Sequence, residues 1–163
     1  MDMFEGKSAQ ELLQIYCETL KELRRRGLTR SINNPAADFT ETLVANALTL
    51  TLVKGSTTGY DATDQSGRRY EIKGRRLTYE NKSRQMSFIR GLDLAHFDLL
   101  AGVLFDENFA VHRGCVIPRE GVMQMARYVK HVKSWKIYLR DSVWDGPGVR
   151  DITDELKQAL RQM

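Results

Sequence analysis

GYDATDQSGRRYEIK, residues 59–73, decides the fold of this chain, because its alternation and its turn together specify one β-hairpin. Asp64 suits the first position of a type I turn. Gly67 suits the left-handed residue that completes a three-residue hairpin loop, 65–67. This turn pairs Asp64 with Arg68, and the pairing of the two strands follows from that pair.

The predicted register places two carboxylates on neighbouring strands opposite each other. Asp61 meets Glu71, and Lys73 follows Glu71 on the same face. The β-carbons of directly opposed residues lie about 5 Å apart, and like charges there are destabilising. Lys73 offsets part of this repulsion, and a divalent cation could offset the rest. The other face of the hairpin is predicted to pack, through Tyr60, Ala62, Tyr70 and Ile72.

Two carboxylates and several waters are the ligands that Mg²⁺ favours, because this hard ion takes oxygen ligands and keeps much of its hydration shell. A bound ion would hold the scissile phosphate and lower the pKa of an attacking water. Lys73 would orient that water. The hairpin therefore predicts a site for Mg²⁺-dependent phosphodiester hydrolysis, with Mn²⁺ able to substitute. A solvated charged hairpin face is the alternative that needs no function.

The positive charge of the chain is unevenly distributed. The whole chain carries +4, but residues 68–90 hold eight basic residues and two acids, which leaves 17 basic and 19 acidic residues elsewhere. A local excess of this kind is typical of a phosphate-binding surface, although a solvated charged face is also compatible with it. We expect the residues just after the hairpin to contact DNA, namely Arg75, Arg76, Lys82, Arg84 and Gln85.

Helices are predicted before and after a small sheet. Ser8 and Glu11 form a capping-box signature for an amphipathic helix over 8–26, and an Asn-Pro pair opens a second helix over 34–52. The later patterns predict strands over 97–105 and 109–117, a helix over 119–132, a strand over 135–139 and a terminal helix beginning at 151–154, while 83–94 could be helix or loop. This order indicates one three-layer α/β domain spanning residues 1–163.

The spacing of Asp61 and of Glu71-Ile72-Lys73, ten residues later on the next strand, resembles the motif of the PD-(D/E)XK phosphodiesterase superfamily. The resemblance implies a restriction-endonuclease-like α/β/α domain with a small mixed central sheet. It also implies that Asp61, Glu71 and the carbonyl of Ile72 hold Mg²⁺, and that Lys73 assists the nucleophilic water. Two departures are Tyr60 in place of proline and the lack of a tyrosine four residues after Gln85, and the second favours an endonuclease.

Members of this superfamily often take another acid from the preceding helix, and Glu41 stands where that acid would be. If the helix begins at Asp38, Glu41 completes a capping box and is structural. If the helix begins at Pro35, Glu41 lies on an apolar stripe and needs a partner. The sequence leaves both interpretations open.

The function that the sequence predicts is that of a Mg²⁺-dependent DNA endonuclease. A non-cleaving DNA-binding module on the same fold is the alternative, and the confined basic stretch disfavours a protein-interaction domain. Since one such site cuts one strand, double-strand cleavage predicts a homodimer. Cys17 and Cys115 belong to no metal-spaced cluster, and the longest apolar run, 99–105, is too short to span a bilayer. These features predict a soluble, cytoplasmic protein.

Overall fold

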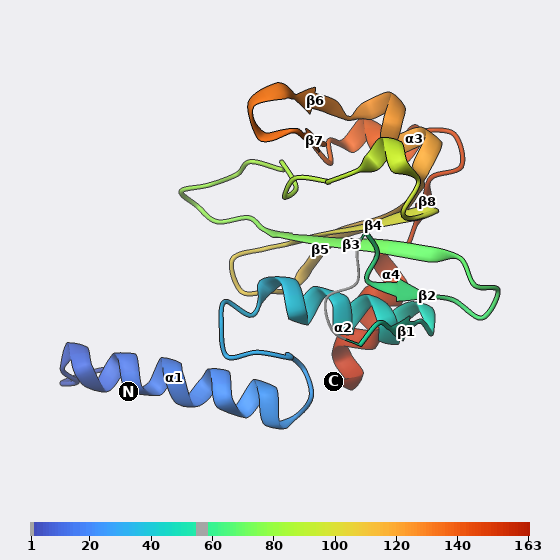
Figure 1. Cartoon of the computed structure of the whole chain (residues 1–163). Helices are drawn as coiled ribbons and strands as arrows, with labels where there is room; N and C mark the ends of the chain where they lie inside the picture. The colour runs from blue at the N-terminus through green and yellow to red at the C-terminus, as the bar shows by residue number, and fades with distance from the viewer. Residues whose placement is uncertain (1, 55–58) are drawn as a thin grey trace.

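The computed structural model describes residues 2–54 and 59–163, and it shows a mixed α/β fold built on a six-stranded sheet (Figure 1). The sheet order is β1 (Thr51–Leu52), β2 (Ala62–Thr63), β3 (Arg69–Arg76), β4 (Leu99–Phe105), β5 (Val111–Pro118) and β8 (Arg150–Asp151). Strands β3 and β4 run parallel, whereas the other neighbours are antiparallel. The predicted mixed sheet is confirmed. Residues 57 and 58, where the predicted hairpin began, lie outside the described residues.

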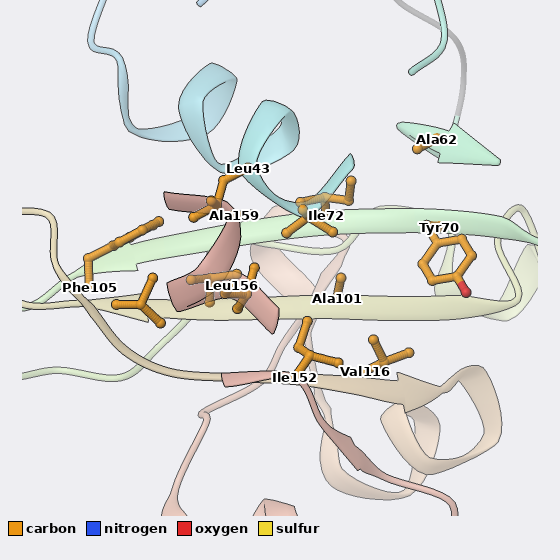
Figure 2. Packing of buried hydrophobic residues seen from close by; sticks show 13 residues of the cluster. Leu43, Ala62, Tyr70, Ile72, Ala101, Phe105, Val116, Ile152, Leu156 and Ala159 are labelled. Carbon is orange, nitrogen blue, oxygen red and sulfur yellow. The ribbon is translucent and has the colours of Figure 1, made fainter. Parts of the chain in front are cut away.

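The two faces of the sheet are covered differently. Helices α2 (Ala36–Leu48) and α4 (Thr153–Gln162) pack on one face, where Leu43, Ile72 and Leu156 meet in a shared core (Figure 2). The opposite face is covered by short elements: α3 (Arg119–Met125), the ribbon β6 (Arg127–Val129) with β7 (Ser134–Lys136), and 3-10 turns at Leu92–Leu94, Lys130–Val132 and Asp141–Asp145. The second layer is therefore only partly helical, unlike the predicted α/β/α arrangement.

Strand β4 is buried on both faces of the sheet, which explains its unbroken apolar sequence. Ala101 and Val103 belong to the core beneath α2 and α4, whereas Leu100 and Leu104 belong to the core beneath α3 and the ribbon. A strand covered on both faces reads as a continuous apolar run, whereas an alternating pattern marks a half-exposed strand. In the part of the chain that the structure describes, no helix is long and apolar enough to cross a membrane.

The predicted first helix is confirmed as α1 (Ala9–Arg25), with its capping box. The Ser8 hydroxyl accepts the N–H of Glu11 at 3.3 Å, and the Glu11 carboxylate accepts the N–H of Ser8 at 2.7 Å. The helix nevertheless projects away from the sheet and its two layers (Figure 1). Only Leu20 of α1 is buried, so its amphipathic pattern does not serve the core.

Two predicted helices are shorter in the structure. The second helix ends at Leu48, because Thr49 adopts a left-handed φ of 55° and the chain then pairs with β2 instead of continuing as helix. The predicted helix over 119–132 is wrong beyond Met125. From Arg127 the chain forms β6, where Tyr128 packs against Trp135 of β7 with ring centroids 5.2 Å apart. This cross-strand aromatic pair stabilises the ribbon over the helix.

The segment that the sequence left undecided, 83–94, is mainly extended. Its Met86 N–H donates to Ile137 at 2.9 Å and its Ile89 N–H donates to Trp135 at 2.8 Å. These bonds lay it beside the predicted strand over 135–139, which forms β7 and then continues as irregular extended chain. The hairpin of β4 and β5 and the terminal helix α4 are confirmed, whereas β8 and the turn at Asp141–Asp145 were not predicted.

We predict that Leu156→Ala lowers the free energy of unfolding by about 2–5 kcal/mol, because it empties space in the core beneath α4. Leu156 is fully buried, whereas Leu94 in the 3-10 turn Leu92–Leu94 is 65% exposed. Leu94→Ala is the matched control, and we expect its effect to stay within about 0.5 kcal/mol. Urea denaturation of both variants measures the difference, and equal destabilisation would contradict the packing described.

Candidate active site

The turn between β2 and β3 has the predicted structure. The Asp64 N–H donates to Arg68 at 3.1 Å, and the Gly67 N–H donates to Asp64 at 3.0 Å. Gly67 adopts a φ of 83°, which glycine accommodates without steric cost. Thr63 pairs with Arg69, so the register predicted from the turn is confirmed next to the loop.

The ladder departs from regular pairing at Asp61. Its N–H donates to the carbonyl of Tyr70 at 2.7 Å, and its carboxylate accepts the N–H of Ile72, also at 2.7 Å. The extra residue resembles a β-bulge, which redirects side chains. Tyr60 accordingly packs against the core beneath α3 while Ala62 packs beneath α2, so the prediction that these two share a face is wrong. The Asp61 carboxylate is therefore hydrogen-bonded to the backbone N–H of Ile72, the residue that follows Glu71 in β3.

Glu71 and Lys73 form a largely buried ion pair. They alternate along β3 with Tyr70 and Ile72, which pack beneath α2, so both side chains point to the opposite face. The Lys73 Nζ lies 2.9 Å from a Glu71 carboxylate oxygen, and the two side chains are only 11% and 16% exposed. A hairpin face merely solvated by water is thus not what the structure shows.

The surroundings of the Asp61 carboxyl disfavour its charged form. Burial raises its pKa to about 6, and the negative charge of Glu71 adds to the rise. The hydrogen bond from Ile72 and the positive charges of Lys73 and Arg30 oppose it. Asp61 therefore lies in a region with more negative charge than the protein neutralises, which is the environment that a cation relieves.

Glu41 lies inside α2 and is not a helix cap. The helix begins at Ala36, which excludes the capping-box interpretation, and the Glu41 carboxylate is buried against the guanidinium of Arg30. Burial raises the pKa of Glu41 to about 7, the charge of Asp61 adds to the rise, and Arg30 opposes it. Glu41 and Asp61 thus share one electrostatic environment, to which Glu71 also contributes.

Two features of this environment had no signal in the sequence. Arg30 follows α1 in an irregular segment, and its guanidinium also donates to the carbonyl of Val53 at 3.3 Å. Gly74 lets α2 approach β3 closely, since a β-carbon there would overlap the side chain of Thr40. The fold therefore brings Glu41, next to Thr40, toward the hairpin, although neither residue type nor spacing indicated it.

The residues predicted to contact DNA do not share one surface. Arg75 lies on the same face of β3 as Lys73 and donates to the carbonyl of Ser83 at 3.1 Å. Arg76 points to the other face, where its guanidinium lies 5.0 Å from the ring centre of Phe109. Neither arginine forms an ion pair among the described residues. Both charges are available to a phosphate, but from opposite faces of β3.

The other three residues predicted to contact DNA differ in whether their side chains already have a partner in the structure. Lys82 is exposed beside the turn between β4 and β5. Arg84 forms an ion pair with Asp141 at 2.7 Å, and the Gln85 side chain accepts the hydroxyl of Tyr138 at 2.7 Å. Arg84 and Gln85 thus have structural partners, and their contact with DNA stays a prediction.

The oxygen ligands present fit Mg²⁺ and Mn²⁺ better than metals that favour sulfur or imidazole ligands. Within 2–54 and 59–163, no three His, Cys, Asp or Glu side chains are grouped so that they could hold a metal ion. Asp61 and Glu71 provide two carboxylates, and the Ile72 carbonyl faces the same edge of β3 as the N–H that Asp61 accepts. Mg²⁺ is commonly held by one or two carboxylates while it keeps several waters, and two carboxylates with one carbonyl are ligands of that kind.

Comparison with known proteins does not identify a family for this chain: no protein-family model matches it, and a search of curated proteins finds no match either. The functional assignment therefore depends on the chemistry of the site itself.

We predict that Asp61→Asn stabilises the metal-free protein near pH 8 but not near pH 4. The raised pKa means that folded Asp61 keeps its proton to about pH 6, so the wild type loses stability as pH rises from about 4 to 6. The asparagine cannot ionise, and it avoids a loss of up to about 3 kcal/mol, or about 5–10 °C in Tm. Thermal unfolding in EDTA across this pH range measures the effect.

Asp64→Asn on the same hairpin is the matched control with the opposite sign. Hydrogen bonds from Ser66 and Arg68 lower the pKa of Asp64 to about 2, so its charge stabilises the fold above its unfolded pKa. This variant should be less stable than the wild type near pH 8. If Asp61→Asn behaved like Asp64→Asn, the electrostatic description of the site would be wrong.

Proposed function

We propose that this protein is a Mg²⁺-dependent DNA endonuclease whose active site comprises Asp61, Glu71 and Lys73, with Glu41 contributing from α2. The observation that supports this most directly is the buried contact between Lys73 and Glu71 beside a carboxyl with a raised pKa. Removing two charges from water costs free energy that their attraction only partly returns. Clusters of buried, perturbed ionisable groups of this kind are concentrated at functional sites.

The chain's own residues divide the work of phosphodiester hydrolysis. Asp61 is held by the Ile72 N–H, and Glu71 is held by Lys73, so both carboxylates are oriented before a ligand arrives. Bound Mg²⁺ would polarise the scissile phosphate and supply an acidified water. Lys73 would donate a hydrogen bond to that water and offset the negative charge that grows on the phosphate oxygens in the transition state. The attacking water would lose its proton to solvent as its oxygen bonds to phosphorus, and the leaving oxygen would take a proton from a solvent water as its bond to phosphorus breaks.

The arrangement of the elements supports a restriction-endonuclease-like fold within the PD-(D/E)XK superfamily. A helix that carries an acid precedes a hairpin that carries Asp61 and Glu71-Ile72-Lys73. The second strand of the hairpin, β3, pairs in parallel with β4. The alternative is a non-cleaving DNA-binding module. The lack of a three-acid metal cluster among the described residues favours that alternative, and the Lys73 variant separates the two.

We predict that Lys73→Ala lowers the rate of plasmid nicking by about 10²–10³-fold in Mg²⁺, because it removes transition-state stabilisation. Affinity for DNA in EDTA should change by less than about threefold, since one buried charge is lost. Lys157→Ala, which removes an exposed lysine of α4 on the other side of the sheet, is the control and should keep the wild-type nicking rate. Nicking by Lys73→Ala at the wild-type rate would refute the assignment, and a wild type that binds DNA without cutting would support the alternative.

We propose a homodimer as the working form, with the apolar face of α1 covered by a second copy. Leu13 and Tyr16 on this face are 65% and 52% exposed. The first half of the helix carries Glu11 and no basic residue, whereas the second half and the residue after it carry three arginines and Lys21 against Glu18 and Glu22. An antiparallel pair of α1 helices would place acidic halves against basic halves around a two-fold axis, as an isologous interface requires.

We predict that Leu13→Glu combined with Tyr16→Glu converts the dimer to a monomer in sedimentation velocity. Both side chains are exposed, so the fold should survive, while double-strand cleavage falls and nicking remains. Gln14→Glu, on the opposite side of α1, is the control and should leave the dimer intact. A wild type that is monomeric both free and on DNA would contradict the dimer.

A further inference from the structure

A cationic cavity of about 500 Å³ lies in the layer formed by the ribbon and the turn that follows it. Its polar lining consists of Arg127, Lys136, Tyr138, Arg140 and Ser142. The cavity contains three basic side chains and no acidic one. Its composition therefore selects for an anion with more than one negative charge.

The three basic side chains are not neutralised from nearby. Among the residues described, none of Arg127, Lys136 and Arg140 forms an ion pair. Asp141, the nearest acid in sequence, is engaged with Arg84 at 2.7 Å and with Arg113 at 3.2 Å. The positive potential in the cavity is thus left for a ligand.

The charge of this layer is hidden in the overall composition. Residues 121–140 contain five basic residues and no acid, whereas the rest of the chain holds 20 basic and 21 acidic residues. The expectation that the basic excess lies only in 68–90 is therefore incomplete. A second basic stretch exists, and it is distant in sequence from the hairpin.

The ring of Tyr138 contacts two of the three basic side chains of the cavity, Lys136 and Arg140. The Lys136 Nζ and the Arg140 Cζ lie 5.6 and 5.4 Å from the centre of its ring, and its hydroxyl donates to Gln85 at 2.7 Å. The two cations are therefore placed around a fixed aromatic ring before a ligand binds. Side chains that are already ordered lose less conformational entropy on binding.

The cavity and the candidate active site lie on the same side of the sheet. Val143, which lines the cavity, packs with Leu100 and Leu104 of β4 in the core opposite α2. Glu71 and Lys73 point to that same side of β3. Both therefore lie on the face of the sheet opposite α2 and α4.

We propose that this cavity binds the phosphate backbone of DNA beside the point of cleavage. Three cations around an open concavity suit successive phosphates, and guanidinium groups bind phosphate oxygens in pairs. The proposal rests on the proposed function, because it assigns the substrate-positioning surface of the same active site. Contacts to the backbone position a substrate without reading its sequence.

The test measures the salt dependence of DNA binding for a variant that combines Arg127→Ala, Lys136→Ala and Arg140→Ala. Fluorescence anisotropy with a labelled duplex of about 20 base pairs, in EDTA, excludes cleavage from the measurement. Since each lost phosphate contact lowers the slope of log K against log salt by about 0.9, the slope should fall by about 2–3. The Kd at about 0.1 M salt should rise by at least about tenfold, and nicking should weaken with it.

The control combines Arg150→Ala, Lys157→Ala and Arg161→Ala, which removes the same charge through three exposed cations on β8 and α4, away from this face. The control should keep the wild-type slope within about 0.5. If the cavity variant matched the control while the wild type bound and cut DNA, this inference would be overturned and the proposed function would stand. A wild type that neither binds nor cuts DNA would overturn both.

Discussion

The hydrogen bond from the Ile72 N–H to the Asp61 carboxylate determines how the rest of the site is arranged. It replaces a backbone pair at the point where the hairpin ladder becomes irregular, and it turns Asp61 toward β3. Tyr60 is displaced to the other core, and Asp61 comes under the influence of the Glu71 charge. A single irregular residue thus converts a simple hairpin into a cluster of interacting carboxyl groups.

Two cations from different parts of the chain reduce the electrostatic repulsion among these carboxyl groups. Lys73 contacts Glu71 from two residues away on the same strand, and Arg30 contacts Glu41 from the segment before α2. These two ion pairs do not fully offset the burial and repulsion of the carboxyl groups, since the pKa values of Asp61 and Glu41 remain raised. The fold therefore keeps residual negative charge where a nuclease would bind a metal ion, in line with the trade between stability and function at active sites.

The positive charge has the complementary distribution. The hairpin and its continuation place Arg75 on the side of Lys73, while the ribbon places Arg127, Lys136 and Arg140 around a cavity on that side. Long-range attraction between such a face and a polyanion speeds association and falls with salt. The overall charge of +4 therefore does not reveal that acidic and basic groups are gathered in different parts of the structure.

The sequence by itself determined the elements whose signals are local: the capping box of α1, the turn at Gly67, and the alternation that sends Tyr70 and Ile72 into the core. Only the tertiary structure decided the features that depend on distant contacts. Residues 127–129 carry a helical pattern yet form a strand, because pairing with β7 stabilises them more than a further helical turn. The same holds for Arg30 beside Glu41 and for the cationic cavity, since burial and charge pairing depend on which segments the fold brings together.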